Sequence, residues 1–151
     1  MLTVKLSGKE DLKNLKKTGW KVVMAHGCFD ILHIGHIRHL QAAKALGDIL
    51  IVSVTSDKYV NKGSGRPIFT VKERMETLCA LQCVDYVVPN DAPDVLELLG
   101  IIRPNIFVKG ADYKGKKIKE SDTMKYIGGK IAFTDTPQFH TTDLIKRIKQ
   151  C

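Results

Sequence analysis

The sequence predicts an α/β fold in which one five-stranded parallel sheet carries helices on both faces. Short apolar runs rich in β-branched residues alternate along the chain with stretches whose apolar residues recur every three or four positions. The run 49–54 is apolar almost throughout, which is typical of a strand buried on both faces of a parallel sheet. With 151 residues, 44% of them hydrophobic, the chain can bury a core and fits one domain over residues 1–151. The expected strands cover 21–25, 49–54, 85–88, 106–108 and 130–133.

The net charge and the cysteine pattern indicate which ligands and which compartment to expect. A net charge of +8 suits anionic ligands such as nucleoside triphosphates and sugar phosphates, and also RNA. The lysines are spread over the whole chain and are not interleaved with stacking aromatic residues, so no nucleic-acid partner is expected. The four cysteines form no Cys-x-x-Cys pair, no secretory leader precedes them, and no apolar stretch is long enough to cross a bilayer. We therefore expect a cytoplasmic protein with reduced thiols and no membrane partner.

Two helix starts carry capping-box patterns, in which the first side chain and the one three residues later satisfy each other's backbone N–H groups. Ser7 and Glu10 predict a short helix before the first strand, and Thr70 and Glu73 predict a helix after the second strand. Arg74 falls in the first turn of that later helix, where the helix dipole disfavours a cation, so a phosphate is its expected partner. Further helices are expected at 36–46, 93–99, 121–127 and from 142 onward.

The chemistry is expected in the segment from Ala25 to His36, which leaves the first strand and enters the next helix. At such a junction the free backbone N–H groups and the positive end of the helix dipole favour a phosphate. Gly27 and Gly35 would let the backbone approach a ligand closely or take a positive φ.

Two histidines distinguish this junction from an ordinary phosphate loop. His33 and His36 can both sit at the first helical turn and donate hydrogen bonds to a triphosphate, which stabilises charge that develops in nucleotidyl transfer. A solvated helix cap is one alternative. A metal site is another, because His26, Cys28 and His39 crowd the same stretch. No second ligand cluster is visible elsewhere, so no protein-bound metal is expected.

Other cationic segments are candidates for phosphate contacts. Lys44 follows His36 by about two helical turns and could reach back, although exposed helical lysines are usually solvated. The polar connection 55–67 is long, and it places positive charge at Lys62 and Arg66, as a lid or substrate contact would; a plain surface loop is the alternative.

The chain's later segments extend the expected site. The strand 106–108 runs into Lys109-Gly110-Ala111-Asp112-Tyr113, and ligands gather where parallel strands end, although an ordinary turn would also fit. Thr141 and Thr142 could cap the last helix while their hydroxyl and N–H groups meet a phosphate; capping alone explains one of them. The basic stretch 114–119 has no assigned role.

The stretch from Gly27 to His36 resembles the signature of the cytidylyltransferase-like nucleotidyltransferases, and the resemblance covers about residues 22–148. The closest subfamily is the adenylyltransferase domain of ADP-heptose synthase, chiefly for the Arg-Pro and Lys-Gly-x-Asp-Tyr segments. Glycerol-3-phosphate and ethanolamine-phosphate cytidylyltransferases share the first motif and the final Thr-Thr. The resemblance implies a Rossmann-like domain and a homodimer. The other matching segments, in family order, are 65–69, 73–74, 84–88, 108–113 and 141–146.

The resemblance implies that an acceptor phosphate attacks the α-phosphate of a nucleoside triphosphate in line, and that pyrophosphate leaves. It places His33 and His36 at the α- and β-phosphates, and Lys44 and Arg74 at the leaving pyrophosphate. Mg²⁺ would accompany the triphosphate with few protein ligands. Asp30 would orient the nucleotide or a metal, or would cap the turn. Expected nucleotide contacts are Gly27, Cys28, Phe29, Asp30, Gly35, Lys109, Gly110, Asp112, Thr141 and Thr142, and expected acceptor contacts are Arg66, Lys109 and Tyr113.

The implied substrates are ATP and D-glycero-D-manno-heptose 1-phosphate, for a cell-surface polysaccharide precursor. The alternatives are CTP with glycerol 3-phosphate, an amino-alcohol phosphate or another capsule-precursor phosphate, and a non-enzymatic nucleotide sensor or RNA-binding module. The chain departs from the family near its end. Asp135 and Gln138 stand where cytidylyltransferases commonly have arginine and glycine, and His140 stands where the family usually has serine.

Overall fold

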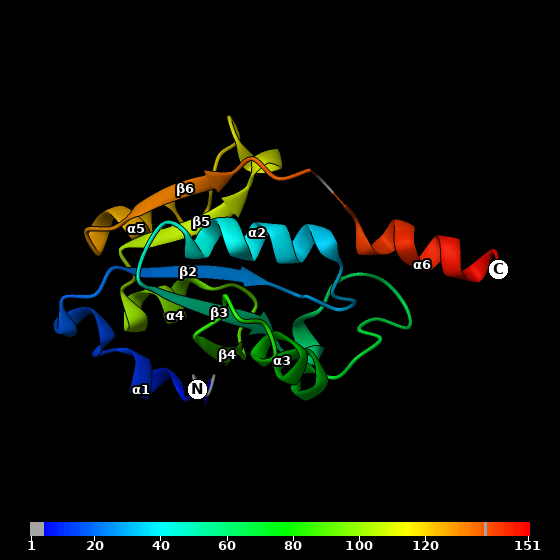
Figure 1. The fold of residues 1–151 in the computed structure, drawn as a ribbon, viewed down its shortest axis with the longest axis horizontal. Helices are drawn as coiled ribbons and strands as arrows, with labels where there is room; N and C mark the ends of the chain where they lie inside the picture. The colour runs from blue at the N-terminus through cyan, green and yellow to red at the C-terminus, as the bar shows by residue number, and fades with distance from the viewer. Residues whose placement is uncertain (1–4, 138) are drawn as a thin grey trace.

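The computed structural model describes residues 5–137 and 139–151, and Gln138 therefore lies outside the described residues. A parallel sheet forms its centre, with the strand order β1-β4-β3-β2-β5-β6 (Figure 1). The strands are β1 (Lys5–Leu6), β2 (Val22–Gly27), β3 (Ile49–Thr55), β4 (Tyr86–Asn90), β5 (Ile106–Gly110) and β6 (Lys130–Thr134). The helices are α1 (Lys9–Leu12), α2 (Ile34–Lys44), α3 (Val71–Cys79), α4 (Leu96–Ile102), α5 (Ser121–Tyr126) and α6 (Thr141–Lys149), and short 3-10 turns are η1 (Leu15–Thr18), η2 (Asp57–Tyr59) and η3 (Ala111–Tyr113).

The α/β architecture and the five predicted parallel strands are confirmed, and a sixth strand lies at one edge. β1 contains two residues and pairs in parallel with β4, with Leu6 opposite Val87. A strand this short shows no period-two alternation, so the sequence pattern did not indicate it.

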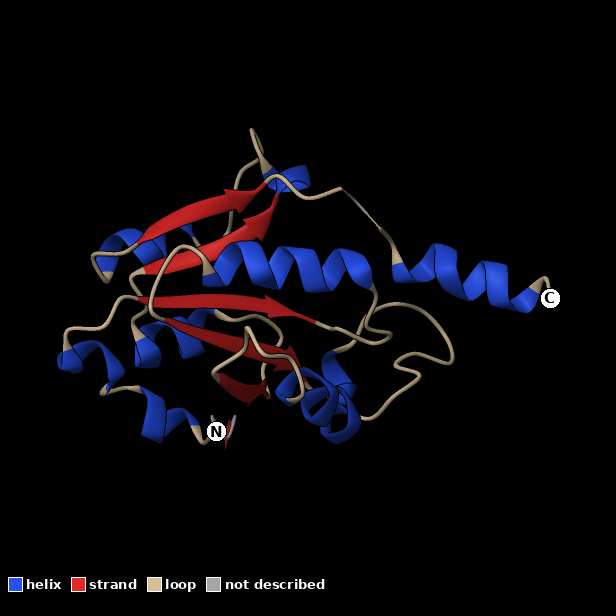
Figure 2. Cartoon of the chain, viewed as in Figure 1, coloured by secondary structure: helices blue, strands red, loops and turns tan. Residues whose placement is uncertain are grey.

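Helices cover both faces of the sheet, as predicted (Figure 2). Alternate residues of β2 point to opposite faces, so Val23 and Ala25 belong to one apolar core while Val22 and Met24 belong to the other. The first core packs against α2 and α3, and the second packs against α1, α4 and α5. Both faces of the central strands are therefore shielded from water, which explains the continuous apolar run in β3.

One capping box is confirmed and the other lies one residue further along. The Thr70 hydroxyl accepts from the Glu73 N–H at 3.3 Å, and the Glu73 carboxylate accepts from the Thr70 N–H at 2.8 Å. At the first helix Gly8, in an extended conformation, is the N-cap, and the Asp11 carboxylate accepts from its N–H at 3.2 Å. Glu10, predicted to close that box, instead pairs with Lys13.

The strand order creates a crevice at the carboxyl edge of the sheet. From the central β2 the chain builds β3 and β4 on one side and then crosses to build β5 and β6 on the other. The segments that follow β2 and β5 diverge at this switch point, where α/β folds bind ligands. The N-terminus of α2 lies at the same edge.

The last helix differs from the others in its packing. In Figures 1 and 2, α6 extends away from the sheet toward the C-terminus, and none of its residues is buried. Among the helices of residues 5–137 and 139–151, none has the length and apolar character needed to span a membrane.

Candidate active site

Two cavities adjoin at the carboxyl edge of the sheet. The β6 cavity, of about 190 Å³, lies beside the end of β6, and the strap cavity, of about 220 Å³, lies beside residues 60–69, which we call the strap. The β6 cavity is lined by His33, Gly35, His36, His39, Gly110, Thr136, Pro137 and Phe139. The strap cavity is lined by His26, Gly27, Cys28, Phe29, Asp30, His36, His39, Lys62, Arg66 and Thr141.

A larger cavity of about 310 Å³ lies at the end of β4, between the start of α1 and α4. None of the predicted site residues lines it. The two smaller cavities gather most of them, so we place the site there despite the difference in size.

The predicted histidine pair lies together at the start of α2, with rings stacked at 3.8 Å between centroids. The Nδ1 atom of His33 accepts from the Gly35 N–H at 3.1 Å, and the Nδ1 atom of His36 accepts from the His33 N–H at 3.3 Å. Because each Nδ1 is an acceptor, each neutral ring carries its proton on Nε2. The Nε2 atom of His33 is buried and has no hydrogen-bond partner in the described part of the chain. The backbone thus prepares two N–H donors for a ligand.

Both rings are neutral at pH 7. Burial, followed by the charges of the neighbouring His33, His39 and Lys62, lowers the pKa of His36 to about 4. Burial also lowers the pKa of His33, with a contribution from His140. A stacked pair of neutral imidazoles avoids the repulsion between two imidazolium ions, and each ring still donates one hydrogen bond.

The two glycines are needed for side-chain packing, which corrects the prediction of positive φ. Neither Gly27 nor Gly35 has a positive φ, whereas Phe29 between them does, at 51°. A Cβ at Gly35 would lie 2.9 Å from the His33 ring, and one at Gly27 would lie 3.0 Å from the Phe29 ring. The Phe29 ring in turn contacts His36 edge-on at 5.4 Å. The missing side chains therefore make room for the rings that hold the histidines.

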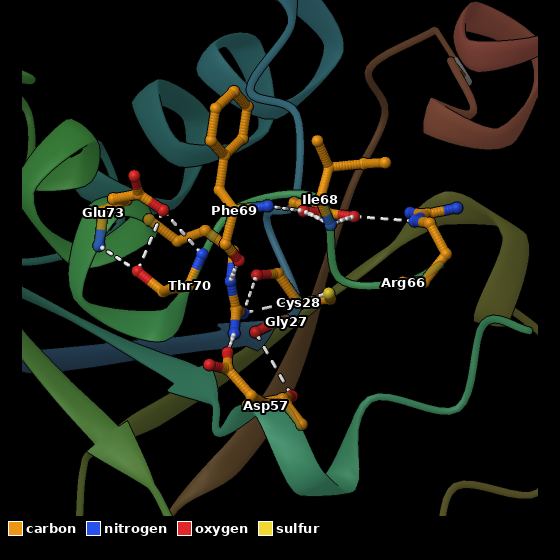
Figure 3. Close-up of polar contacts among 11 residues, drawn as sticks. Gly27, Cys28, Asp57, Arg66, Ile68, Phe69, Thr70 and Glu73 are labelled. Atoms are coloured by element: carbon orange, nitrogen blue, oxygen red, sulfur yellow. Dashed lines mark hydrogen bonds and ion pairs between the residues drawn. The ribbon is translucent and has the colours of Figure 1, made fainter. Parts of the chain in front are cut away.

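Asp30 joins residues 27–36, which we call the signature loop, to the strap (Figure 3). Its carboxylate accepts from the backbone N–H groups of Ile68 and Phe69 at 2.8 and 3.0 Å and pairs with the Arg66 Nε at 2.6 Å. Burial would raise the pKa of Asp30, but the hydrogen bonds from Phe69, Ile68 and Arg66 together hold it below its usual value. The contacts of Asp30 are structural, but its partners lie in the strap and not in the turn that follows Asp30, where the sequence predicted a cap. Arg66, predicted to contact the acceptor, lines the strap cavity from this anchored position.

Arg74 lies behind the signature loop, and it lines neither cavity. Its side chain is fully buried, and its guanidinium donates to the Cys28 and Phe69 carbonyl oxygens at 2.6 and 2.9 Å and pairs with Asp57 at 2.6 Å. Figure 3 shows these three partners converging from the signature loop, the strap and η2. The predicted contact of Arg74 with the triphosphate is therefore not the one that the folded chain shows. Arg74 shapes the loop because its donors are already occupied by protein oxygens.

The predicted contact of Lys44 with the leaving pyrophosphate is also wrong. Its Nζ pairs with Asp85 at 2.5 Å and donates to the Asp48 carbonyl oxygen, and both of these residues lie just before strands, at the amino edge of the sheet. This edge is opposite the two cavities. Lys62, unlike Lys44, lines the strap cavity together with His36. The sequence had marked Lys62 only as part of a positively charged loop.

The Lys109–Tyr113 segment is only partly at the cavities. Gly110 lines the β6 cavity, whereas Lys109 pairs with Glu120 at 3.3 Å and lies over the Tyr113 ring at 4.2 Å, and none of these three side chains lines either cavity. Asp112 acts at a distance, since its charge raises the pKa of His39 against the larger lowering by burial.

The two threonines are separated by the structure. Thr141 lines the strap cavity, and its hydroxyl donates to the Ile31 carbonyl oxygen at 3.4 Å, whereas Thr142 is exposed and lines neither cavity. Of the two threonines predicted to meet a phosphate, only Thr141 lies at a cavity, and its phosphate contact stays a prediction.

Two further histidines line the cavities and were not among the predicted site residues. The Nδ1 atom of His26 lies 2.7 Å from the Ser53 hydroxyl, and burial, followed by the charge of Lys109, lowers the pKa of His26 to about 4. His39 lies one turn after His36 on α2 and bonds to Thr134 at 2.7 Å. The three-residue spacing from His36 was the available signal for His39, and the position at the end of β2 was the signal for His26.

The side chains do not form a metal-binding cluster in the part of the chain that the structure describes. No group of three or more His, Cys, Asp or Glu side chains there is placed to hold a metal ion. All four cysteines are free thiols.

Comparison with known proteins agrees with this arrangement. A family model described as Cytidylyltransferase-like matches residues 24–147. The "Bifunctional protein HldE" of Nitratiruptor sp. is 45% identical over 141 residues, which are 92% of this chain and 30% of that protein. The protein of the same name from Syntrophotalea carbinolica is 38% identical over 151 residues, covering 95% of this chain and 31% of that protein. The chain thus spans just under a third of the length of these relatives.

A solved structure shares the fold. The crystal structure of the lipopolysaccharide core biosynthesis protein from Thermoplasma volcanium GSS1 superposes with a TM-score of 0.68 at 30% identity. The match covers 81% of this chain and 100% of that one. The extent of the family match, the histidine pair at the start of α2 and the shared fold lead to one conclusion: the chain belongs to the cytidylyltransferase-like family of nucleotidyltransferases.

Proposed function

We propose that the chain transfers an adenylyl group from ATP to the phosphate of a heptose 1-phosphate and releases pyrophosphate. The observation that carries the proposed transfer is the pair of Nε2–H donors on His33 and His36, presented at the α2 N-terminus where two cavities adjoin. The choice of ATP and a heptose phosphate is supported by the Arg-Pro and Lys-Gly-x-Asp-Tyr segments and by the similarity to the HldE proteins.

The two cavities suggest a division of the substrates. The β6 cavity, bounded by Gly110 and Pro137, takes the nucleoside, and the more cationic strap cavity takes the phosphates. There Lys62 neutralises the leaving pyrophosphate, and Arg66, oriented by Asp30, binds the acceptor phosphate.

The reaction requires positioning more than proton transfer. The attacking acceptor oxygen is already anionic, so no general base or covalent enzyme nucleophile is needed. As the bond from the α-phosphate to pyrophosphate breaks, negative charge grows on the phosphate oxygens. The N–H donors of His33 and His36 and the α2 N-terminus stabilise that charge without rearranging.

Mg²⁺ is expected to arrive with the triphosphate. Asp30, the carboxylate at the strap cavity, has both oxygens engaged by Arg66 and backbone N–H groups and does not fit as a metal ligand. Phosphate oxygens and water would hold most of the ion's coordination sphere, as is usual for Mg²⁺ bound with nucleotides.

Pyrophosphate release, measured across ATP, CTP, GTP and UTP with a panel of phosphorylated sugars and alcohols, tests the proposal. We expect turnover with ATP and a heptose 1-phosphate, and a loss of about 10²-fold or more in His36→Ala, which removes one donor. Turnover with CTP alone would reject adenylyl transfer. Nucleotide binding with no pyrophosphate release under any combination would favour a sensor. The homodimer stays a prediction that light scattering can check.

A further inference from the structure

His39 is a third imidazole at the site that the proposed mechanism has not yet used. It follows His36 by three residues on α2, so both rings lie on the same face of the helix. His36 and His39 line both the β6 cavity and the strap cavity, and no other described residue does so. His39 therefore stands where the two cavities meet.

The His39 ring is held from the opposite wall of the site. Its Nδ1 atom lies 2.7 Å from the hydroxyl oxygen of Thr134, the last residue of β6, which is 3% exposed. This bond links α2 to β6 across 95 positions of sequence. The other ring nitrogen, Nε2, has no hydrogen-bond partner among residues 5–137 and 139–151. One nitrogen is thus tethered, and the other is available to a ligand.

The three rings share one arrangement. In His33 and His36 a backbone N–H donates to Nδ1, and in His39 the same atom lies at hydrogen-bond distance from the Thr134 hydroxyl, a group that can either donate or accept. A neutral imidazole that accepts at Nδ1 must carry its proton on Nε2. Burial lowers the pKa of His39, against an opposing effect of Asp112, so the ring is neutral at pH 7. When the Thr134 hydroxyl donates to Nδ1, the Nε2 atom of His39 carries the proton and is a hydrogen-bond donor.

We propose that His39 is a further catalytic residue, whose Nε2–H donates to a non-bridging oxygen of the transferred α-phosphate, and that Thr134 is the residue that positions it. This inference rests on the proposed function. With the nucleoside in one cavity and the acceptor and pyrophosphate in the other, the α-phosphate is the group that must lie at their junction. Charge shifts at its oxygens during transfer, so a donor there acts on the transition state.

Substitutions at both members of the pair test the contact. His39→Ala should lower kcat about tenfold or more, with a smaller change in KM, because a transition-state donor is lost. In His39→Gln the side-chain amide can donate from near the Nε2 position and should restore part of that loss. Thr134→Val, which removes the hydroxyl at nearly constant shape, should lower kcat less than His39→Ala does, and Thr134→Ser should remain close to the unmodified chain. Arg38→Ala, exposed on the same helix and outside both cavities, is the matched control.

A readout independent of turnover is the tautomer of His39. With ¹⁵N-labelled histidine, NMR should show His39 protonated on Nε2 in the free protein and a mixture of tautomers in Thr134→Val. Addition of ATP should change the ¹⁵N chemical shift of His39 Nε2. Pyrophosphate, a smaller probe that has no α-phosphate, should change it less. Thermal melting of each variant checks that it folds.

Two results would overturn the inference: kcat within about twofold of the unmodified chain in a folded His39→Ala, or a His39 proton on Nδ1 with no response of Nε2 to ATP. Failure of the proposed function is separate, because it would appear as no pyrophosphate release by the unmodified chain. In that case a shift of His39 Nε2 with ATP would still establish the contact, and its absence would still remove it.

Discussion

The strap side and the C-terminal side of the site are held in place very differently. On the strap side, Asp30 and Arg66 pair with side chains that are 1% and 9% exposed, and the fully buried Arg74 ties the strap to the signature loop. On the C-terminal side, Thr141 reaches the body through a 3.4 Å hydrogen bond, and no residue of α6 is buried. The strap and the signature loop are thus held by buried ion pairs, whereas Thr141, which lines the same strap cavity from the C-terminal side, has few contacts to order it.

The largest effect is expected from Arg74→Met, which removes the charge that joins three segments. Asp57 and the Cys28 carbonyl oxygen would lose their donor, and removal of one partner of a buried pair is strongly destabilising. Because Asp57 is 45% exposed and water can replace part of the interaction, we expect a loss of about 3 kcal/mol in the free energy of unfolding. Urea unfolding measures it, with Arg38→Ala as the control. A loss below about 1 kcal/mol would mean that the strap side is not held more tightly than the C-terminal side.

Asp30→Asn should have the next largest effect. An amide presents N–H groups, as well as one oxygen, to the N–H groups of Ile68 and Phe69, and it leaves Arg66 without its counter-charge. Hydrogen bonds to charged groups of this kind contribute about 2 kcal/mol. Urea unfolding should show that loss, and the KM for the acceptor should rise more than the KM for the nucleotide, because Arg66 loses its orientation. Equal rises in both KM values would argue against acceptor binding by Arg66.

The pH dependence of stability gives a further test of the same region. His26 and His36 have pKa values of about 4 in the folded chain, below the ordinary value of 6.5. Their contribution is fully present above pH 6.5 and is lost as the pH falls toward 4, because the unfolded chain binds protons first. Urea titrations at pH 7 and pH 5 should differ by about 2 kcal/mol for each histidine, and His26→Gln should reduce that difference. A stability that is flat over this interval would show that the rings are not buried in the neutral form.

The smallest effect belongs to the C-terminal side. Ile148 on α6 is 58% exposed, so Ile148→Ser should change the free energy of unfolding by no more than about 0.5 kcal/mol. Urea unfolding of the isolated chain checks this value. A loss of 2 kcal/mol or more would mean that α6 is packed against something in solution, and the two sides of the site would then be alike.

Local patterns predicted the sheet and the histidine pair, because both depend on neighbours in the sequence. Alternation and run length mark the five strands, and the three-residue spacing of His33 and His36 places them on one helical turn. Lys44 was misplaced because eight helical residues carry it about 12 Å along the axis from His36, toward Asp85. Lys44 does lie about two turns after His36, as predicted, but its side chain does not reach back to the cavities.

Arg74 and Lys62 show what local patterns cannot reveal. The partners of Arg74 come from residues 28, 57 and 69, and no periodicity links these positions. Lys62 lies in an irregular loop whose path depends on the anchoring of Arg66 to Asp30. Both residues are placed by contacts between segments distant in sequence, so their roles became visible only in the folded chain.

The bond from Arg74 to the Cys28 carbonyl has a consequence for protein engineering. A chimera that received residues 27–36 from a relative, while keeping its own α3 and η2, would inherit a loop whose support was built for another backbone. A graft that moves the loop, the strap, η2 and the first turn of α3 as one unit would keep Arg74 together with all of its partners.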